Sequence, residues 1–202
     1  MASYLALSMI QNLPFQLILA SKSPRRKQLL EEAGFEFEIR TQNVEEDFPS
    51  EMQPSLVPVF LAEKKALGVS ILSKDELIIA SDTIVEAGGE ILGKPDSLTH
   101  AEEILRKLSG TSHKVITGVC LRSMSFTHSF SEETEVTFKD LTTEEIRHYI
   151  LNYKPFDKAG AYGIQEWIGL IGVSSIHGCY FNVVGFPVAR FYKELNFLLK
   201  TY

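Results

Sequence analysis

The sequence has little cysteine, no zinc-binding pattern and no long apolar run. Its 202 residues include two cysteines, Cys120 and Cys179, which are too few for a disulfide framework. No CxxC occurs, and the five histidines are not spaced as metal ligands. No segment approaches the roughly 20 uninterrupted apolar residues that a membrane span requires. We therefore expect free thiols, no structural zinc and no membrane span.

Basic residues are also in deficit. The chain has 20 Lys and Arg residues against 26 Asp and Glu, which gives a net charge of -6 and a pI near 5.4. This balance excludes a general nucleic-acid-binding protein, which would carry a basic excess. Taken alone, it also argues against a polyphosphate ligand. Net charge governs solubility and long-range steering, however, so this second inference depends on where the basic residues lie.

Several motifs of nucleotide and acyl chemistry are missing. Neither G-x-x-x-x-G-K-[ST] nor G-x-G-x-x-G occurs, which argues against P-loop and Rossmann sites. Ser23, Ser81 and Ser174 have no nucleophile-elbow arrangement around them, so acyl transfer is not supported. The apolar stretch 4–10 has no Lys or Arg before it. We expect an N-terminal extension over 1–16 rather than a signal peptide, and a cytoplasmic protein.

Strand-like and helix-like patterns alternate along the chain, which favours a mixed α/β fold. No linker is polar or long enough to separate domains, so we expect a single domain over 17–202, with two lobes around a cleft. The pattern predicts strands at 17–20, 35–39, 77–85, 91–92, 113–122, 132–138 and 180–184, and helices at 24–34, 54–70, 99–108, 142–152 and 187–199.

A first candidate site is the segment SKSPRR at 21–26, between a buried strand and a helix. Free amides at a helix start bind anions, and arginines in the first turn oppose the usual preference of the helix dipole. Their presence makes sense if an anion lies between them, since a guanidinium matches phosphate bidentately. Ser21 and Arg26 are thus candidate phosphate ligands. A solvated basic helix start is the alternative.

Asp82 is the strongest single candidate in the sequence. Strands are depleted in aspartate, and a buried carboxylate is costly unless it is paired or binds a metal. Within the apolar strand 77–85, Asp82 is therefore a candidate general base or metal ligand. In the alternative reading, Asp82 ends the strand and hydrogen-bonds to its own turn.

Lysines and carboxylates at other points complete the candidate set. Lys94 precedes a proline, Lys158 lies two residues before a glycine, and the acidic cluster 45–47 follows the strand at 35–39. Each alone is more often a solvated surface charge than a ligand. Together with the arginines and Asp82, they indicate phosphoanhydride chemistry without a P-loop.

The ordered set of segments resembles the Maf family of nucleoside triphosphate pyrophosphatases. The matching segments are LASKSPRR at 19–26, SDTIV at 81–85, GKP at 93–95, LSG at 108–110, DKAGAYGIQ at 157–165 and NVVGFP at 182–187. The resemblance implies a mixed sheet flanked by helices, as in the inosine triphosphate pyrophosphatases, with two lobes around a cleft. It also implies a homodimer, as in many members.

The resemblance gives roles to individual residues. Asp82 corresponds to the family's proton acceptor. Arg25, Thr83 and Gln165 stand at positions that separate its branches, and they match the branch acting on dTTP and UTP. The family lysines that line the phosphate path correspond to Lys65, Lys94 and Lys158. An acidic position near the divalent metal, Mg²⁺ or Mn²⁺, corresponds to Glu45 or Glu46, with Asp82 as a further ligand. One departure is Lys64, where the family usually has glutamate.

The expected reaction is attack of water at the α-phosphorus, with release of pyrophosphate. The substrates would be dTTP and UTP, or modified pyrimidine nucleotides, so that non-standard nucleotides are kept out of nucleic acids. The Gln165 amide can pair with the N3–H and a carbonyl of uracil, but it disfavours cytosine only if its neighbours lock its orientation. Two alternatives are a nucleotide-sensing inhibitor of septum formation and a 7-methyl-GTP pyrophosphatase. Arg25 and Gln165 disfavour the second.

Overall fold

The computed structural model describes residues 13–201, so most of the extension expected over 1–16 lies outside the described residues. Leu13 and Phe15 pack against the core, and the first strand begins at Gln16. In chain order the elements are β1 (Gln16–Leu19), α2 (Pro24–Glu32), β2 (Phe37–Ile39), η1 (Pro54–Leu56), α3 (Val57–Gly68), β3 (Glu76–Ala87), β4 (Glu90–Leu92), α4 (Leu98–Leu108), β5 (Ser112–Arg122), β6 (Thr127–Phe138), α5 (Thr143–Tyr153), η2 (Ala159–Ala161), α6 (Trp167–Gly172), β7 (Val173–His177), α7 (Tyr180–Val184) and α8 (Val188–Thr201).

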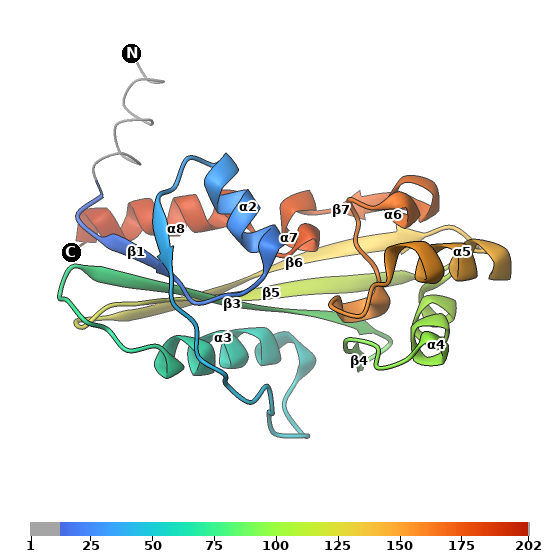
Figure 1. Cartoon of the computed structure of the whole chain (residues 1–202), viewed down its shortest axis with the longest axis horizontal. Helices are drawn as coiled ribbons and strands as arrows, with labels where there is room; N and C mark the ends of the chain where they lie inside the picture. Colours follow the sequence, from blue (N-terminus) through green and yellow to red (C-terminus); the bar gives the residue numbers. More distant parts are fainter. Residues whose placement is uncertain (1–12, 202) are drawn as a thin grey trace, which may run out of the picture.

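One mixed sheet runs the length of the molecule (Figure 1). Its order is β2-β1-β3-β5-β6-β7, with β4 paired to β3. The three long strands β3, β5 and β6 are antiparallel, whereas β1 and β2 are parallel to their neighbours. Helices cover both faces, which confirms the predicted mixed α/β fold. No helix within residues 13–201 is long and apolar enough to cross a membrane.

Strand β3 has two different partners along one of its edges. β1 pairs with its beginning, as far as Leu19 opposite Ile79, and β4 pairs with its end, starting from Val85 opposite Leu92. Residues 80–84, between these two partners, pair with β5 on the other edge only. The sheet therefore has an open notch at the middle of β3, where backbone groups are left for other partners.

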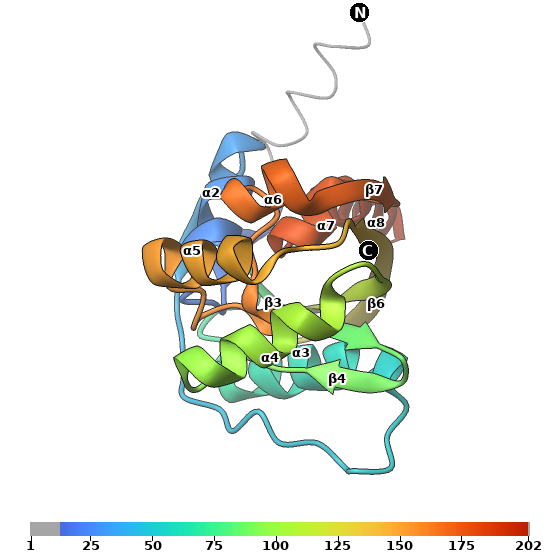
Figure 2. The ribbon, with the colours of Figure 1, turned by 90° about the vertical axis from the view of Figure 1, so that its right-hand side faces the viewer.

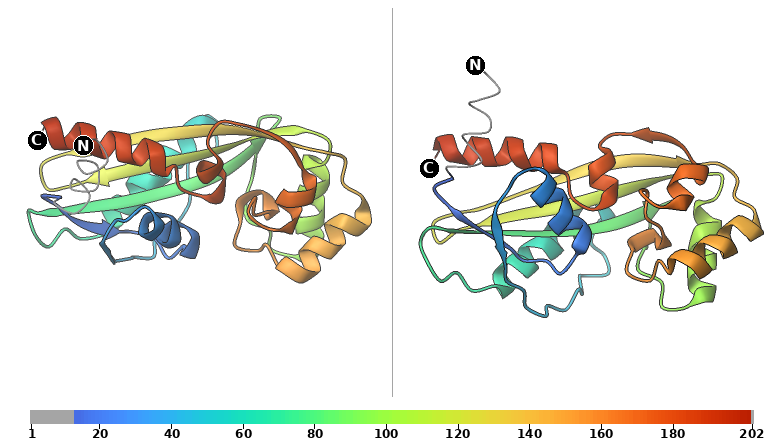
Figure 3. Two further views of the ribbon diagram at one scale, coloured as in Figure 1. Left: turned by 90° about the horizontal axis from the view of Figure 1, so that it is seen from above. Right: turned by 45° about the horizontal axis from the view of Figure 1, so that its top comes forward.

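Apart from α3 and α7, the helices fall into two groups on either side of this notch. The first lobe consists of β1, β2, α2 and α8, whose apolar side chains form one core cluster with the beginning of β3. The second lobe consists of β4, α4, α5, η2 and α6, which pack around the opposite end of the long strands. Figure 2 shows the second lobe end-on, and Figure 3 shows the two lobes at opposite ends of the sheet. The two predicted lobes are thus present.

Side chains of β3 alternate between two different surroundings. Ile78, Ala80 and Ile84 face helix α3, which covers one face of the sheet. Leu77 and Ile79 face α2 and α8 on the other. Consecutive residues of β3 at the notch therefore project from opposite faces of the sheet.

The predicted strand at 180–184 is wrong, because this segment forms helix α7. The sequence YFNVV is rich in aromatic and β-branched residues, which favours a strand locally. The buried Asn182 side chain decides otherwise, since its amide donates to the Val115 carbonyl and to Thr134 Oγ1, both at 3.0 Å. Gly185, at a φ of 130°, then ends the helix. Helix α6 and strand β7 also lie in a stretch for which no element was predicted.

Gly118 allows helix α3 to pack closely on the sheet. It lies opposite Asp82 in the β3–β5 ladder, and an added Cβ would overlap the backbone of Pro58 and Val59. Replacing Gly118 by alanine should therefore lift the start of α3 and lower the free energy of unfolding by about 1–3 kcal/mol. Urea denaturation measures this change. Gly93→Ala is the control, because its Cβ would meet open space. Equal effects of the two substitutions would contradict the close packing.

Candidate active site

A cleft of about 520 Å³ opens at the notch of β3 and reaches into both lobes. Segments far apart in the sequence meet there: the β1–α2 turn, the loop after β2, helix α3, the middle of β3, the loop before α4, and the stretch around η2 and α7. All but one of the predicted site residues line the cleft, namely Ser21, Arg25, Arg26, Glu46, Lys65, Asp82, Thr83, Lys94, Lys158 and Gln165. Glu45 is exposed and is not among the lining residues.

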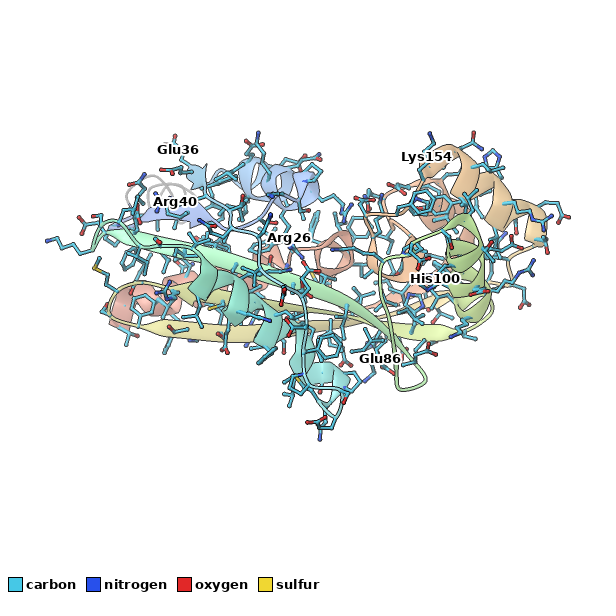
Figure 4. All side chains as sticks on the ribbon, turned by 60° about the horizontal axis from the view of Figure 1, so that its bottom comes forward. Arg26, Glu36, Arg40, Glu86, His100 and Lys154 are labelled. Atoms are coloured by element: carbon cyan, nitrogen blue, oxygen red, sulfur yellow. The ribbon has the colours of Figure 1, made fainter. Side chains whose placement is uncertain are left out.

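Arg26 occupies the notch itself. Ser23 caps α2 by accepting from the Arg26 amide, and Pro24 begins the helix, as predicted for the helix at 24–34. The guanidinium then reaches β3, where Nη1 donates to the Ser81 carbonyl at 2.8 Å and Nη2 to Thr83 Oγ1 at 3.1 Å. Figure 4 shows Arg26 at mid-length of the molecule, between the lobes. Arg26 thus takes the hydrogen-bonding place that a neighbouring strand would fill.

Most donors of Arg26 are used within the protein. Nε donates to the Gly185 carbonyl at 3.0 Å, and Nη1 also donates to Ser21 Oγ at 3.4 Å. Since a guanidinium has five N–H groups, one on Nη2 is left for a ligand. Burial lowers the pKa of Arg26, although the charge of Asp82 acts in the opposite direction. Arg26 is therefore first a clamp between elements, and its predicted phosphate contact would use the remaining N–H.

On the face of the sheet covered by α3, carboxylates and ammonium groups alternate. Lys65 Nζ contacts Asp82 Oδ1 and lies 2.7 Å from Glu46 Oε1, while Lys94 Nζ lies 3.3 Å from Glu46 Oε2. Burial opposes ionisation of Glu46, but the hydrogen bond and charge of Lys65, with those of Lys94, outweigh it and lower its pKa. Asp82 is 7% exposed, in mid-strand, so it does not end the strand.

The departure at Lys64 has a local partner. Lys64 Nζ contacts Asp47, next to the pair formed by Lys65 and Glu46. Two consecutive lysines of α3 thus hold two consecutive carboxylates of the loop after β2. The pairing brings Glu46 into the cleft.

The opposite wall of the cleft belongs to the second lobe. Asp157 accepts from Lys158 Nζ through Oδ1 and from Arg25 Nη1 through Oδ2, both at 2.7 Å. Burial opposes ionisation of Asp157, and the two cations lower its pKa despite this. Because Arg25 lies on α2, this ion pair connects the two lobes across the cleft.

Lys158 is buried and has a second carboxylate partner, Glu166, at 3.1 Å. The hydroxyl of the buried Tyr149 donates to Glu166 and accepts from the Gly163 amide at 3.0 Å. Burial, followed by the hydrogen bond with Glu166, raises the pKa of Tyr149. This network fixes the ammonium group of Lys158 at the cleft wall.

Sequence reasoning gave no role to Asp157, Glu166, Tyr149 or Thr117. The first two lie within or beside the segment 157–165, so their position was a usable signal. Nothing in the local pattern distinguishes Tyr149 from other core residues of α5. Thr117 contacts Thr83, and this contact follows from the strand register, in which the two residues lie opposite each other.

A divalent ion fits this cleft only in part. Residues 13–201 contain no group of three His, Cys, Asp or Glu side chains that could hold a metal. Asp82 and Glu46 do converge on one point, the ammonium group of Lys65. Mg²⁺ commonly binds through one or two protein carboxylates together with substrate phosphates and water. The carboxylate pair therefore suits an ion that arrives with a nucleotide better than a permanently bound metal.

Comparison with known proteins identifies the family of this chain. The Ham1 protein of Staphylococcus aureus superposes with a TM-score of 0.44 at 16% identity, over 62% of this chain and 72% of that one. A dTTP/UTP pyrophosphatase of Phocaeicola vulgatus is 51% identical over 191 residues, which cover 93% of this chain and 99% of the relative. That of Cytophaga hutchinsonii is 51% identical over 180 residues, 89% of this chain and 83% of the relative. The family model of Maf-like proteins matches residues 16–198, and the chain belongs to the Maf family.

Proposed function

We propose that the protein is a nucleoside triphosphate pyrophosphatase that hydrolyses dTTP and UTP to the monophosphate and pyrophosphate. The observation that carries this proposal is Asp82, a buried carboxylate in a cleft whose other charged groups are mainly cations. Relatives with 51% identity over most of the chain carry the name dTTP/UTP pyrophosphatase, which supports the substrate class. The notch provides room for a nucleotide between the lobes.

Asp82 is placed to accept the proton of the attacking water. Its Oδ1 is held by Lys65, whereas no partner of Oδ2 lies within residues 13–201. The free oxygen can bind a water molecule and take its proton as the water attacks the α-phosphorus. Lys65 restricts the orientation of the carboxylate, which keeps Oδ2 available.

The cations of the cleft would stabilise the leaving pyrophosphate. Arg25 comes from α2 in the first lobe, and Lys94 and Lys158 come from the second lobe, so that a polyphosphate between the lobes meets positive charge from both. Cations that are already fixed in position stabilise developing charge without reorganisation. The phosphate would displace Asp157 from Arg25, because both anions compete for one guanidinium.

We further propose that Mg²⁺ or Mn²⁺ assists the reaction, held by Glu46 and Asp82 with phosphate oxygens of the substrate. When bound, such an ion would polarise the phosphate and offset part of its charge. Glu45, which is exposed, is the weaker ligand candidate of the two neighbouring glutamates. The cytoplasmic location and the homodimer inferred from the family resemblance stay predictions.

A substrate panel tests the proposal. Pyrophosphate release from dTTP, UTP, CTP, GTP and ATP is measured with Mg²⁺, with Mn²⁺ and with EDTA. We expect dTTP and UTP to be hydrolysed fastest, and EDTA to abolish the activity. A preference for purines would refute the substrate assignment, and full activity in EDTA would refute the metal. Tight binding of dTTP without any product would instead favour a nucleotide sensor.

A further inference from the structure

The cleft needs a group of fixed hydrogen-bond polarity if it is to distinguish uracil from cytosine. Uracil and thymine present an N3–H donor, whereas N3 of cytosine is an acceptor. Gln165 is exposed, and within residues 13–201 its amide has no hydrogen-bond partner. An amide that is free to flip can offer either its oxygen or its NH₂, so Gln165 alone accepts both rings. The discrimination must come from another group.

Thr83 is such a group, because the partners of its hydroxyl determine which atom donates in each of its hydrogen bonds. Arg26 Nη2 can only donate, so Thr83 Oγ1 accepts from it at 3.1 Å. Thr83 Oγ1 also lies 2.9 Å from Thr117 Oγ1. Thr117 in turn lies 3.4 Å from the Asn182 carbonyl, which can only accept. Thr117 therefore uses its single proton on Asn182 and accepts the proton of Thr83.

The result is a directed chain from Arg26 through Thr83 and Thr117 to Asn182. A hydroxyl has one proton and two lone pairs. With one lone pair engaged by Arg26 and the proton given to Thr117, Thr83 has only a lone pair left for a ligand in the cleft. Thr117 is completely buried, so water does not compete for this proton.

The surroundings of Thr83 suit a pyrimidine ring rather than a phosphate. Thr83 and Val85 share a face of β3 that is opposite to the face of Asp82 and Lys65. Val85 and its partner Val115 are buried cleft residues, and Val183 of α7 lies beside them. Apolar side chains here can pack on the flat ring. Arg26 is the charged group in contact with Thr83, and most of its donors are used within the protein. Arg25, Lys65, Lys94 and Lys158, the other candidate phosphate ligands, come from other segments of the cleft wall.

We propose that Thr117 is a positioning residue that commits the Thr83 hydroxyl proton inward, so that Thr83 accepts a hydrogen bond from N3–H of uracil or thymine and repels N3 of cytosine. This inference rests on the proposed function, because it concerns which pyrimidine the cleft accepts. In this account Thr117 fixes Thr83 as a hydrogen-bond acceptor toward the base. The amide of Gln165 can adapt to either pyrimidine.

The test is the ratio of kcat/KM for UTP to that for CTP in Thr117→Val. The two nucleotides share sugar and triphosphate, so their ratio isolates the base. In the variant, the Thr83 proton is released toward the cleft and can be donated to cytosine. We expect the ratio to fall at least about tenfold, with part of the change a gain with CTP. Thr117→Ser keeps the hydroxyl and should retain the ratio of the unmodified protein.

An unchanged ratio in Thr117→Val would overturn the inference. If kcat/KM falls equally for both nucleotides, the ratio is unchanged and the role of Thr117 is merely structural. Thermal unfolding checks that the variant is folded, and Thr117→Ala replaces it if it is not. If the unmodified protein releases pyrophosphate from neither nucleotide, the proposed function fails. The inference is then tested separately by the ratio of dissociation constants for UTP and CTP in the same variants.

Discussion

Replacing Asp82 by asparagine should lower the turnover of dTTP and UTP by at least about 100-fold, while the nucleotide still binds. Asparagine has nearly the same shape but cannot accept the proton of the attacking water. The cations that hold the phosphates come from other elements, so their contribution to binding remains. Steady-state kinetics should show the loss in kcat, and calorimetry with a non-hydrolysable dTTP analogue should show binding within a few fold of the unmodified protein.

A matched control for this substitution is Asp96→Asn. Asp96 is an exposed aspartate in the loop before α4 and is not among the residues that line the cleft. We expect its turnover to be unchanged. Near-normal pyrophosphate release by Asp82→Asn would exclude Asp82 as the base. Loss of both turnover and binding would mean that Asp82 serves mainly to hold the site together through Lys65.

The second large effect is expected from Arg26, which holds the notch, and not from its neighbour Arg25. Arg26→Met removes hydrogen bonds to the carbonyls of Ser81 and Gly185 and to Thr83, so these groups lose their partner at the notch. We expect a loss of about 3 kcal/mol in the free energy of unfolding. For a chain of this size, the melting temperature should fall by roughly 6–12 °C.

Arg25→Met is the control, because the same substitution is made one residue earlier on the same helix turn. Arg25 makes one ion pair with Asp157, whose side chain is 57% exposed, so we expect at most about 1 kcal/mol of destabilisation. Its effect should appear as a raised KM, since Arg25 faces the cleft. Equal melting temperatures for the two variants would contradict the role of Arg26 as the clamp of the notch.

Local patterns identified several parts of this site. Ser23 and Pro24 are typical of a helix start, where α2 begins, and Asp82 stands out because a buried strand rarely contains aspartate. The patterns at 77–85 and 91–92 predicted β3 and β4, which pair with each other. These signals depend on residues close in sequence, which act the same way in any fold.

The arrangement of these parts could not be predicted, since it depends on long-range pairing. Nothing in β3 itself indicates that β1 stops pairing at Ile79 and that β4 begins at Val85, yet this gap makes the cleft. The segment at 180–184 was misassigned because Asn182 finds its partners on β5 and β6. Likewise, Asp157 meets Arg25 only after the lobes are placed.

Global charge was a poor guide to the ligand. The net charge of -6 shows an excess of acidic residues over the whole chain, but many of them are paired with lysine or arginine. Around the cleft, Arg25, Lys65, Lys94 and Lys158 face the same space. A local excess of cations can therefore bind one polyphosphate on an acidic protein.

Hydrolysis of dTTP in ¹⁸O-labelled water shows directly which phosphorus the water attacks. If water activated at Asp82 attacks the α-phosphorus, the label appears in the phosphate of dTMP, and the released pyrophosphate is unlabelled. Mass spectrometry of both products separates these outcomes. Label in pyrophosphate, or release of orthophosphate with dTDP, would show attack at another phosphorus and would contradict the account.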